Sequence, residues 1–136
     1  MDKVVPKNEE FIYEGRVAIS QTDVDGNITF VNRKFCEISG YTSTELIESN
    51  HDIIRHPSAP NEVFDKMWTA LKSGQVWNGP LKNLRKDGMF YWVDMEIAPI
   101  FDDQEQVTGY ISVSKPSPRK NIKENEKIFN NNQTKK

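Results

Sequence analysis

The chain has 136 residues and a formal net charge of −2, with 18 Lys and Arg against 20 Asp and Glu, and this length supports one domain. Its longest apolar run, residues 89–93, is five residues long. A bilayer span needs about 20, so no direct membrane insertion is expected. A single cysteine, Cys36, excludes an internal disulfide and a zinc site with several cysteines. We therefore expect a cytoplasmic protein without a metal.

The balance of charge and the content of apolar residues both change after residue 114. Residues 1–114 carry 11 basic and 18 acidic side chains, whereas residues 115–136 carry 7 basic and 2 acidic ones. The second part has three apolar residues, too few to offset the entropy lost on ordering. We expect an N-terminal cap over 1–15, a folded domain over 16–114 and a polar basic linker or disordered tail over 115–136. Because the tail lacks an aromatic and arginine pattern, nucleic acid is not an expected partner.

The first half of the chain predicts a hairpin and then short helices. Residues 17–23 alternate loosely in polarity, and residues 28–31 follow the turn signal Asp-Gly-Asn at 25–27. Gly40 is typical of the end of a short helix. Two prolines predict an irregular loop over 50–60.

The second half predicts one amphipathic helix and three strands. Residues 61–72 place their apolar side chains on one stripe, which is typical of a helix packed on a core. Strands are expected over 80–85, 89–100 and 107–113. Hairpins pair strands antiparallel, so we expect an α+β domain. Its five-stranded antiparallel sheet is covered on one face by short helices that enclose a pocket.

Recognisable catalytic chemistry is absent from the sequence. It has no phosphate-binding glycine loop, nucleophile elbow or zinc-protease motif, so the chain is not expected to be an enzyme. Asn32 and Asn83 place amides on apolar strands, where an amide suits the edge of a planar heterocycle. Trp68 offers a stacking face. Each has a simpler alternative: Asn32 as a helix N-cap, Asn83 facing solvent, and Trp68 packed in the core.

Two sets of motifs resemble a known family. The order of elements, with Asn32-x-x-Phe35 and residues 39–46, is similar to PAS domains, a family of sensory modules. A narrower set over about 17–114 resembles the aerotaxis-receptor subgroup. Its main motifs are Ile54-Arg55-His56-Pro57, Met67-Trp68, Lys82-Asn83-x-Arg85-Lys86-x-Gly88 and Tyr91-Trp92-Val93.

The resemblance implies non-covalent FAD binding in the pocket. Trp68 would pack against the flavin, Asn32 and Asn83 would bond the polar edge of its ring, and Arg55 and His56 would lie along the cofactor. The subgroup has Asp after its His-Pro pair, where this chain has Ser58, which keeps a hydrogen-bonding group. The implied cofactor residues are Trp68, Asn83, Asn32, Arg55, His56 and Ser58.

The resemblance also implies a role in signalling. Such a module would report redox state or oxygen-linked electron flow to the chemotaxis apparatus, so the expected partner is a chemotaxis receptor or another signalling protein. A homodimer through the N-terminal apolar patch at 11–13 is a further expectation. The location would be cytoplasmic, either free or held at a membrane through a partner or a C-terminal region outside this chain.

Three alternatives remain open. A haem-binding PAS gas sensor would use His51 or His56 as axial ligand, but neither histidine is expected on a helix that faces the pocket. A cofactor-free interaction module has the same fold. A photoreceptor that forms a flavin adduct is disfavoured, because its Asn-Cys-Arg motif is absent and Cys36 falls in a different helix.

Overall fold

The computed structural model describes residues 3–120, 122–124 and 126–127, and its elements follow the expected order. Their bounds are β1 (Ala18–Asp23), β2 (Ile28–Val31), α1 (Arg33–Ser39), α2 (Ser43–Leu46), the 3-10 helix η1 (His51–Ile54), α3 (Asn61–Lys72), β3 (Trp77–Leu84), β4 (Phe90–Phe101) and β5 (Val107–Pro116).

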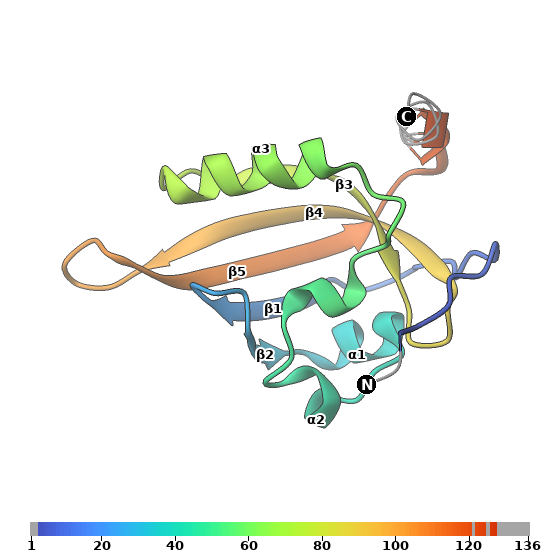
Figure 1. The fold of residues 1–136 in the computed structure, drawn as a ribbon, viewed down its shortest axis with the longest axis horizontal. Helices are drawn as coiled ribbons and strands as arrows, with labels where there is room; N and C mark the ends of the chain where they lie inside the picture. Colours follow the sequence, from blue (N-terminus) through green and yellow to red (C-terminus); the bar gives the residue numbers. More distant parts are fainter. Residues whose placement is uncertain (1–2, 121, 125, 128–136) are drawn as a thin grey trace.

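The sheet has five antiparallel strands in the order β2-β1-β5-β4-β3, which confirms the expected architecture (Figure 1). The first and last strands of the chain therefore lie side by side in its centre. In their register Ser20 lies opposite Ser112, and Thr22 lies opposite Tyr110. These two cross-strand pairs project from the same face of the sheet, because they are two residues apart on each strand.

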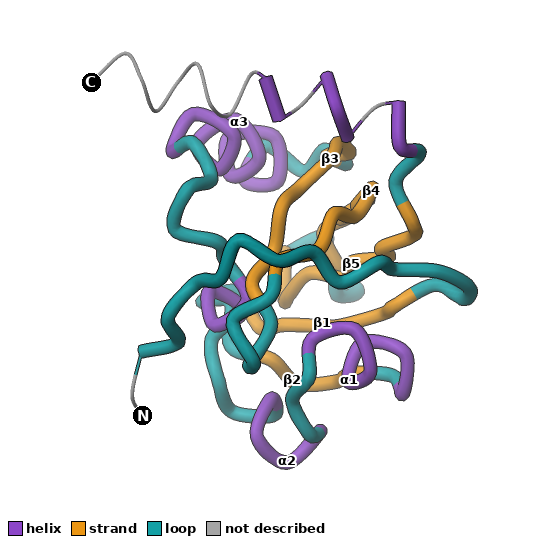
Figure 2. The backbone as a smooth tube through the Cα atoms, turned by 90° about the vertical axis from the view of Figure 1, so that its right-hand side faces the viewer, coloured by secondary structure: helices purple, strands orange, loops and turns teal. Residues whose placement is uncertain are grey.

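Helices lie at both ends of the curved sheet. α3 runs along β3 and β4, whereas α1 and α2 lie beside β1 and β2, with η1 between them (Figures 1 and 2). The stripe predicted for α3 is confirmed, since Met67 and Leu71 are buried. Gly40 ends α1 with φ of 79°, a left-handed conformation that glycine adopts without strain.

β3 begins earlier than expected, at Trp77 rather than Pro80. Proline has no backbone N–H to donate, so it weakens a central strand but is tolerated on an edge. β3 is an edge strand of this sheet, which explains how Pro80 lies inside it.

The N-terminal segment is packed into the fold along the β3–β4 turn. Lys7 N donates to Gly88 O at 2.8 Å, and Phe11 N donates to Phe90 O at 2.7 Å. Gly88 has φ of 93°, and a Cβ there would lie 2.5 Å from a backbone oxygen of the segment. Tyr13 is buried, and its hydroxyl donates to backbone oxygens of Arg16 and Ser114.

The C-terminal part continues beyond the expected last strand. β5 reaches Pro116, and Ser117 Oγ bonds to Asp94 at 3.0 Å. The described residues from 119 onward are helical, and Ile122, only 3 % exposed, packs with Ala59 and Trp92. This contact could not be predicted from composition, because it is made by a single isoleucine in a polar segment. Residues 121, 125 and 128–136 of the predicted tail lie outside the described part, and the domain boundary stays a prediction.

Candidate functional site

A cavity of about 390 Å³ lies between the sheet, η1 and α3. Its walls come from β1, β3, β4, β5, η1, α3 and the turn between β1 and β2. Small-molecule sites typically measure about 300–1,000 Å³ and combine apolar walls with a few polar groups. This cavity has both, since Met67, Leu81, Met95 and Ile97 lie beside the polar side chains described below.

Three of the six predicted cofactor residues line this cavity: Trp68, Asn83 and Arg55. Trp68 of α3 meets the Tyr110 ring of β5 edge to face, with centroids 5.3 Å apart. Asn83 is 6 % exposed, so its expected alternative, a side chain facing solvent, is wrong. The structure thus brings an aromatic ring, a buried amide and a guanidinium to one space.

Arg55 is held in place by three separate contacts. Its backbone forms an isolated antiparallel bridge with Asn83 of β3. Its guanidinium lies 3.8 Å from the centroid of the Phe64 ring and donates to Asn61 Oδ1 at 2.8 Å. Because both side-chain partners belong to α3, Arg55 fastens the loop before α3 to the helix itself.

His56 and Ser58 do not line the cavity. His56 is buried against Phe90, with ring centroids 6.4 Å apart, and its Nδ1 accepts from the Ser58 backbone N–H at 3.0 Å. Ser58 Oγ lies 2.7 Å from the same nitrogen. Burial, and secondarily the charge of Lys82, lower the pKa of His56 to about 4. These residues shape the loop after Arg55, where Ser58 supplies the expected hydrogen-bonding group.

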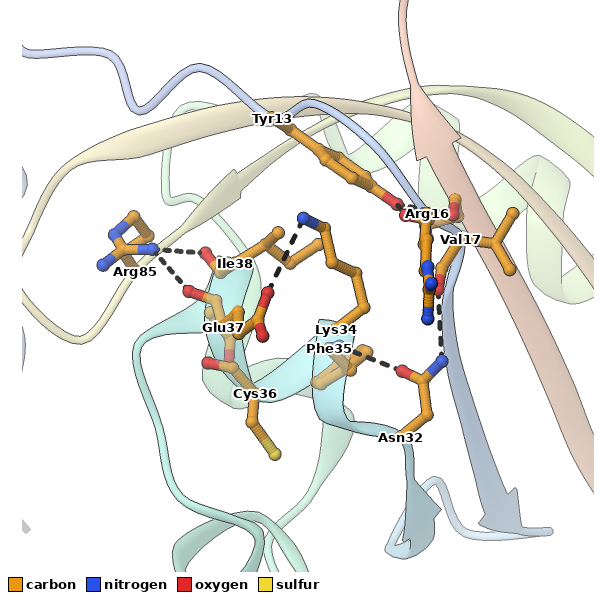
Figure 3. A network of polar contacts seen from close by, with 12 residues as sticks. Tyr13, Arg16, Val17, Asn32, Lys34, Phe35, Cys36, Glu37, Ile38 and Arg85 are labelled. Carbon is orange, nitrogen blue, oxygen red and sulfur yellow. Dashed lines mark hydrogen bonds and ion pairs between the residues drawn. The ribbon is translucent and has the colours of Figure 1, made fainter.

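Asn32 also lies outside the cavity wall, at the N-terminus of α1 (Figure 3). Its Oδ1 accepts from the Phe35 and Ile19 N–H groups, both at 3.0 Å, and its Nδ2 donates to Val17 O at 3.1 Å. The structure therefore shows the simpler alternative for Asn32: it caps α1 and ties that helix to β1.

A polar cluster on the cavity wall was not predicted from the sequence. Ser20 of β1 and Ser112 of β5 lie 2.6 Å apart between their hydroxyl oxygens, and Ser20 Oγ lies 3.2 Å from His51 Nε2. All three residues line the cavity. The expectation that neither histidine faces the pocket is thus wrong for His51. The alternation of β1 and β5 could have indicated this cluster. Inward-facing positions of both strands carry serine or threonine, whereas an apolar core has aliphatic residues there.

The position of His51 is set by the turn between β1 and β2. Its N–H donates to Gly26 O at 2.9 Å, and Asn50 Oδ1 caps η1 by accepting from the Asp52 N–H. Its ring also meets Phe35 edge to face at 5.9 Å. Burial lowers the pKa of His51 despite the nearby Asp52 carboxylate, so the imidazole is neutral near pH 7.

Buried polar groups around Asn83 extend the site toward the core. Tyr91 is 1 % exposed, and burial raises its pKa, while an interaction with the Asn83 side chain opposes that rise. Asn83 therefore lies between the tyrosine and the cavity. Asp25, Asp52, Asp65 and Arg55 are the charged residues that line the cavity.

Metal-binding clusters and membrane-spanning helices are both absent from the described ranges 3–120, 122–124 and 126–127. No group of three or more His, Cys, Asp or Glu side chains there is arranged to hold a metal ion. None of the helices there is long and apolar enough to cross a membrane.

Comparison with known proteins places this chain in a family. The model of the PAS fold family matches residues 28–114. The aerotaxis receptor of Escherichia coli K12 is 40 % identical over 95 residues, which are 70 % of this chain and 19 % of that protein. A nitrogen fixation regulatory protein of Klebsiella pneumoniae is 34 % identical over 104 residues, 76 % of this chain and 21 % of that protein. The chain thus spans about a fifth of these relatives.

Solved structures agree on the fold. A structure described in a flavin-analogue study of the light-oxygen-voltage domain mechanism superposes with a TM-score of 0.71 at 22 % identity, covering 88 % of each chain. At that identity the likeness shows the fold alone. Together with the sheet order and the family match, it leads to one conclusion: the chain belongs to the PAS fold family of sensory domains and is similar to the aerotaxis receptor over 95 residues.

Proposed function

We propose that this PAS domain binds FAD non-covalently in the cavity beneath α3 and reports its redox state. The observation that carries the proposal is the convergence of Trp68, Asn83 and Arg55 on one cavity from three separate elements. The similarity to an aerotaxis receptor supports the same cofactor class.

The residues that line the cavity fit the parts of such a cofactor. Trp68 supplies an aromatic face for a planar ring. Asn83 supplies one donor and one acceptor for a ring edge that alternates the two. Arg55 suits a pyrophosphate, which a guanidinium binds with paired hydrogen bonds. The flavin would supply the electron chemistry, and these side chains would bind it and orient it.

His56, Ser58 and Asn32 take supporting roles in this proposal. His56 and Ser58 hold the loop that follows Arg55 through their mutual hydrogen bonds. Asn32 holds α1 against β1. None of the three lines the cavity, so we assign them to the position of its walls and not to direct contact.

The output of the domain would be a change in protein contacts. A ligand that binds two conformations unequally shifts their populations, and the relatives named above include a receptor and a regulator. We propose a chemotaxis receptor or another signalling protein as the partner of this domain. No catalytic role is proposed for this cavity.

The test is the visible spectrum of the purified protein, followed by chromatography of the cofactor released by heat. A two-banded yellow spectrum and released FAD are expected. Trp68→Ala and Asn83→Asp are each expected to weaken FAD binding at least tenfold, which corresponds to about 1.4 kcal/mol. Asn78→Asp is the matched control, because Asn78 is an exposed asparagine on the same strand and outside the cavity.

Other spectra would contradict the proposal in distinguishable ways. A Soret band would show haem, and His51 would then be the axial ligand to test, because it faces the cavity. A protein that stays colourless after incubation with FAD would be an interaction module. Release of FMN in place of FAD would keep the flavin and correct its identity.

A further inference from the structure

The mouth of the cavity lies between η1 and α3. Residues that line the cavity and are also exposed mark where it meets solvent, and they include Asn50 and Asp52 at η1 and Asn61 and Asp65 on α3. Arg55, which is half-buried, lies in the loop that connects these two helices (Figure 1). A planar ring that enters here passes between η1 and α3, so the mobility of these two walls controls its exchange.

The η1 wall is fixed to the first hairpin by backbone hydrogen bonds. Glu48 N donates to Ile28 O at 3.1 Å, and Ile28 N donates to Ser49 O at 2.8 Å. His51 N donates to Gly26 O at 2.9 Å. These bonds hold the start of η1 against β2 and the turn before it, so we do not expect this wall to open.

The α3 wall is held more firmly in its C-terminal half. Met67 and Leu71 are 5 % and 0 % exposed, whereas the first six residues of the helix are exposed or half-buried. Pro60 at the N-cap provides no side-chain hydrogen bond to the first turn. Between the halves, Thr69 Oγ1 donates to Asp65 O at 2.8 Å, a bond to the preceding turn of a kind that often bends helices. The first two turns of α3 can therefore swing about this point while Leu71 stays in the core.

Arg55 connects the weakly held half of α3 to the rest of the fold. Its backbone bridge with Asn83 ties it to β3. Its guanidinium lies 3.8 Å from the centroid of the Phe64 ring and donates to Asn61 Oδ1 at 2.8 Å. Val63 adds apolar contacts outside the cavity, so the contacts of Arg55 with Phe64 and Asn61 are the ones at the mouth itself.

We propose that the first two turns of α3 form a gate over the cavity and that Arg55 is its latch, which releases Phe64 and Asn61 when a ring enters or leaves and holds them again once the gate has closed. The inference rests on the proposed function for the identity of that ring. Phe64 and Asn61 act through Arg55 and are positioning residues. The bond to Asn61 uses one of the five N–H donors of the guanidinium, so a latched Arg55 keeps donors for a phosphate group of the ligand.

A latch leaves a kinetic signature that differs from that of a ligand contact. Because Arg55 is latched in both the empty and the occupied protein and released only during passage, weakening the latch raises the association and dissociation rate constants by the same factor. The dissociation constant then stays nearly the same. Removal of a group that only contacts the bound ligand changes mainly the dissociation rate constant.

The test is stopped-flow binding of riboflavin to the full chain, followed by the flavin fluorescence. Riboflavin has no phosphate, so a direct contact between Arg55 and a phosphate does not contribute. Asn61→Ala and Phe64→Leu are each expected to raise both rate constants about fivefold, with the dissociation constant changed by less than about twofold. Glu62→Gln is the matched control and should change neither rate constant, because Glu62 is exposed in the same first turn and does not line the cavity.

Hydrogen exchange of the full chain without ligand tests the gate independently. Asn61→Ala is expected to accelerate exchange at the Phe64 and Asp65 amides about fivefold and to leave the Leu71 amide unchanged. Alanine is a better helix former than asparagine, so a helix end that merely frays would exchange more slowly in this variant. The direction of the change therefore separates a latch from fraying.

The outcomes distinguish the gate from the proposed function. Slower or unchanged exchange at Phe64 and Asp65 in Asn61→Ala, or a rise in the dissociation rate constant alone, would overturn the latch and leave the proposed function standing. A chain that binds neither riboflavin nor FAD would overturn the proposed function, while the exchange result still decides the gate. Because Asn61 is exposed, its replacement leaves no void in the core, and we expect the variant to fold.

Discussion

The two histidines are close in sequence and meet different surroundings. His51 faces the cavity, whereas His56 lies outside it against Phe90. His56 Nδ1 accepts from the Ser58 N–H, so a proton on that nitrogen would break this hydrogen bond. Burial and the nearby Lys82 charge add to this penalty and lower the pKa of His56 from 6.5 to about 4.

Stability should therefore depend on pH through His56. Between pH 6.5 and 4 the unfolded chain binds a proton that the folded protein excludes, so the free energy of unfolding falls as pH falls through this window. From about pH 7 to 5 the loss from this group is at most about 2 kcal/mol. Urea unfolding at about pH 7, 6 and 5 measures it.

His56→Gln is the comparison for that experiment, because glutamine cannot titrate. The variant should lose less stability than the wild type over the same pH range, and the difference between the two curves isolates His56 from His51 and the carboxylates. Parallel curves for both proteins would contradict the assigned cause.

The sequence predicts where a side chain points when the residue type and the periodicity of its helix or strand agree. Trp68 lies on the apolar stripe of a helix, so the pattern alone directs it inward. For Asn83 the pattern left a side chain facing solvent as an alternative, and the family resemblance was needed to place it at the cavity. Asn32 stands where a strand ends and a helix starts, and the pattern there does not say whether an amide turns to the ligand or to the backbone N–H groups of the helix. In the structure, Asn32 Oδ1 accepts from the Phe35 N–H, so the amide turns to the helix.

At the scale of elements, the N-terminal segment contributes to the fold. The predicted apolar patch at 11–13 is divided: Tyr13 is buried, Phe11 lies under the Arg85 guanidinium at 4.0 Å, and Ile12 is 52 % exposed. Two of its three side chains are thus used within one chain. Dimerisation through this segment stays a prediction.

Removal of residues 1–15 should lower stability by about 2–4 kcal/mol, because it exposes the surface that Phe11 and Tyr13 cover. Thermal unfolding measures this, and sizing of both proteins at the same concentration shows whether their association also differs. Ile12→Ser separates the two effects, since it changes an exposed side chain. An unchanged melting temperature on truncation would contradict the packing described.

The loop over 50–60 shows what element prediction could not reach. Its prolines marked it correctly as irregular, yet its first part forms η1, whose cap is the Asn50 side chain. So short a helix has no periodicity to detect. This short helix places His51 at the cavity. The polar cluster of Ser20, Ser112 and His51 could therefore not be predicted, because sequence patterns do not detect so short a helix.

At the scale of the molecule, the three hairpins could be predicted from turn signals, and the cavity from helices over a sheet. The pairing of β1 with β5 joins strands from the two ends of the sheet-forming sequence, and no turn signal marks it. The contact of the C-terminal part with the rest could not be predicted from the sequence, because Ile122 is a single apolar residue in a polar stretch. It joins Trp92 of β4 and Ala59 of the loop before α3. The same loop, 55–59, lines the cavity at its first residue and meets the C-terminal part at its last.

Ile122→Ala should loosen this loop. It removes a buried side chain at a cost of about 2–3 kcal/mol, and hydrogen exchange at the Ala59 amide, which donates to His56 O at 3.0 Å, should accelerate. Lys120→Ala, an exposed change in the same helical stretch, is the control. Unchanged protection of Ala59 would mean that the contact does not hold the loop.

The shared loop has a thermodynamic consequence. Pro57 restricts its backbone, and Arg55 and Ala59 anchor its two ends, so we expect a displacement at one end to reach the other. Coupling between two sites is reciprocal in free energy. If occupancy of the cavity changes how tightly the C-terminal stretch is held, then a protein that grips that stretch must change the affinity of the cavity by the same factor. A partner protein bound to the C-terminal stretch would thereby change the affinity of the domain for its own ligand.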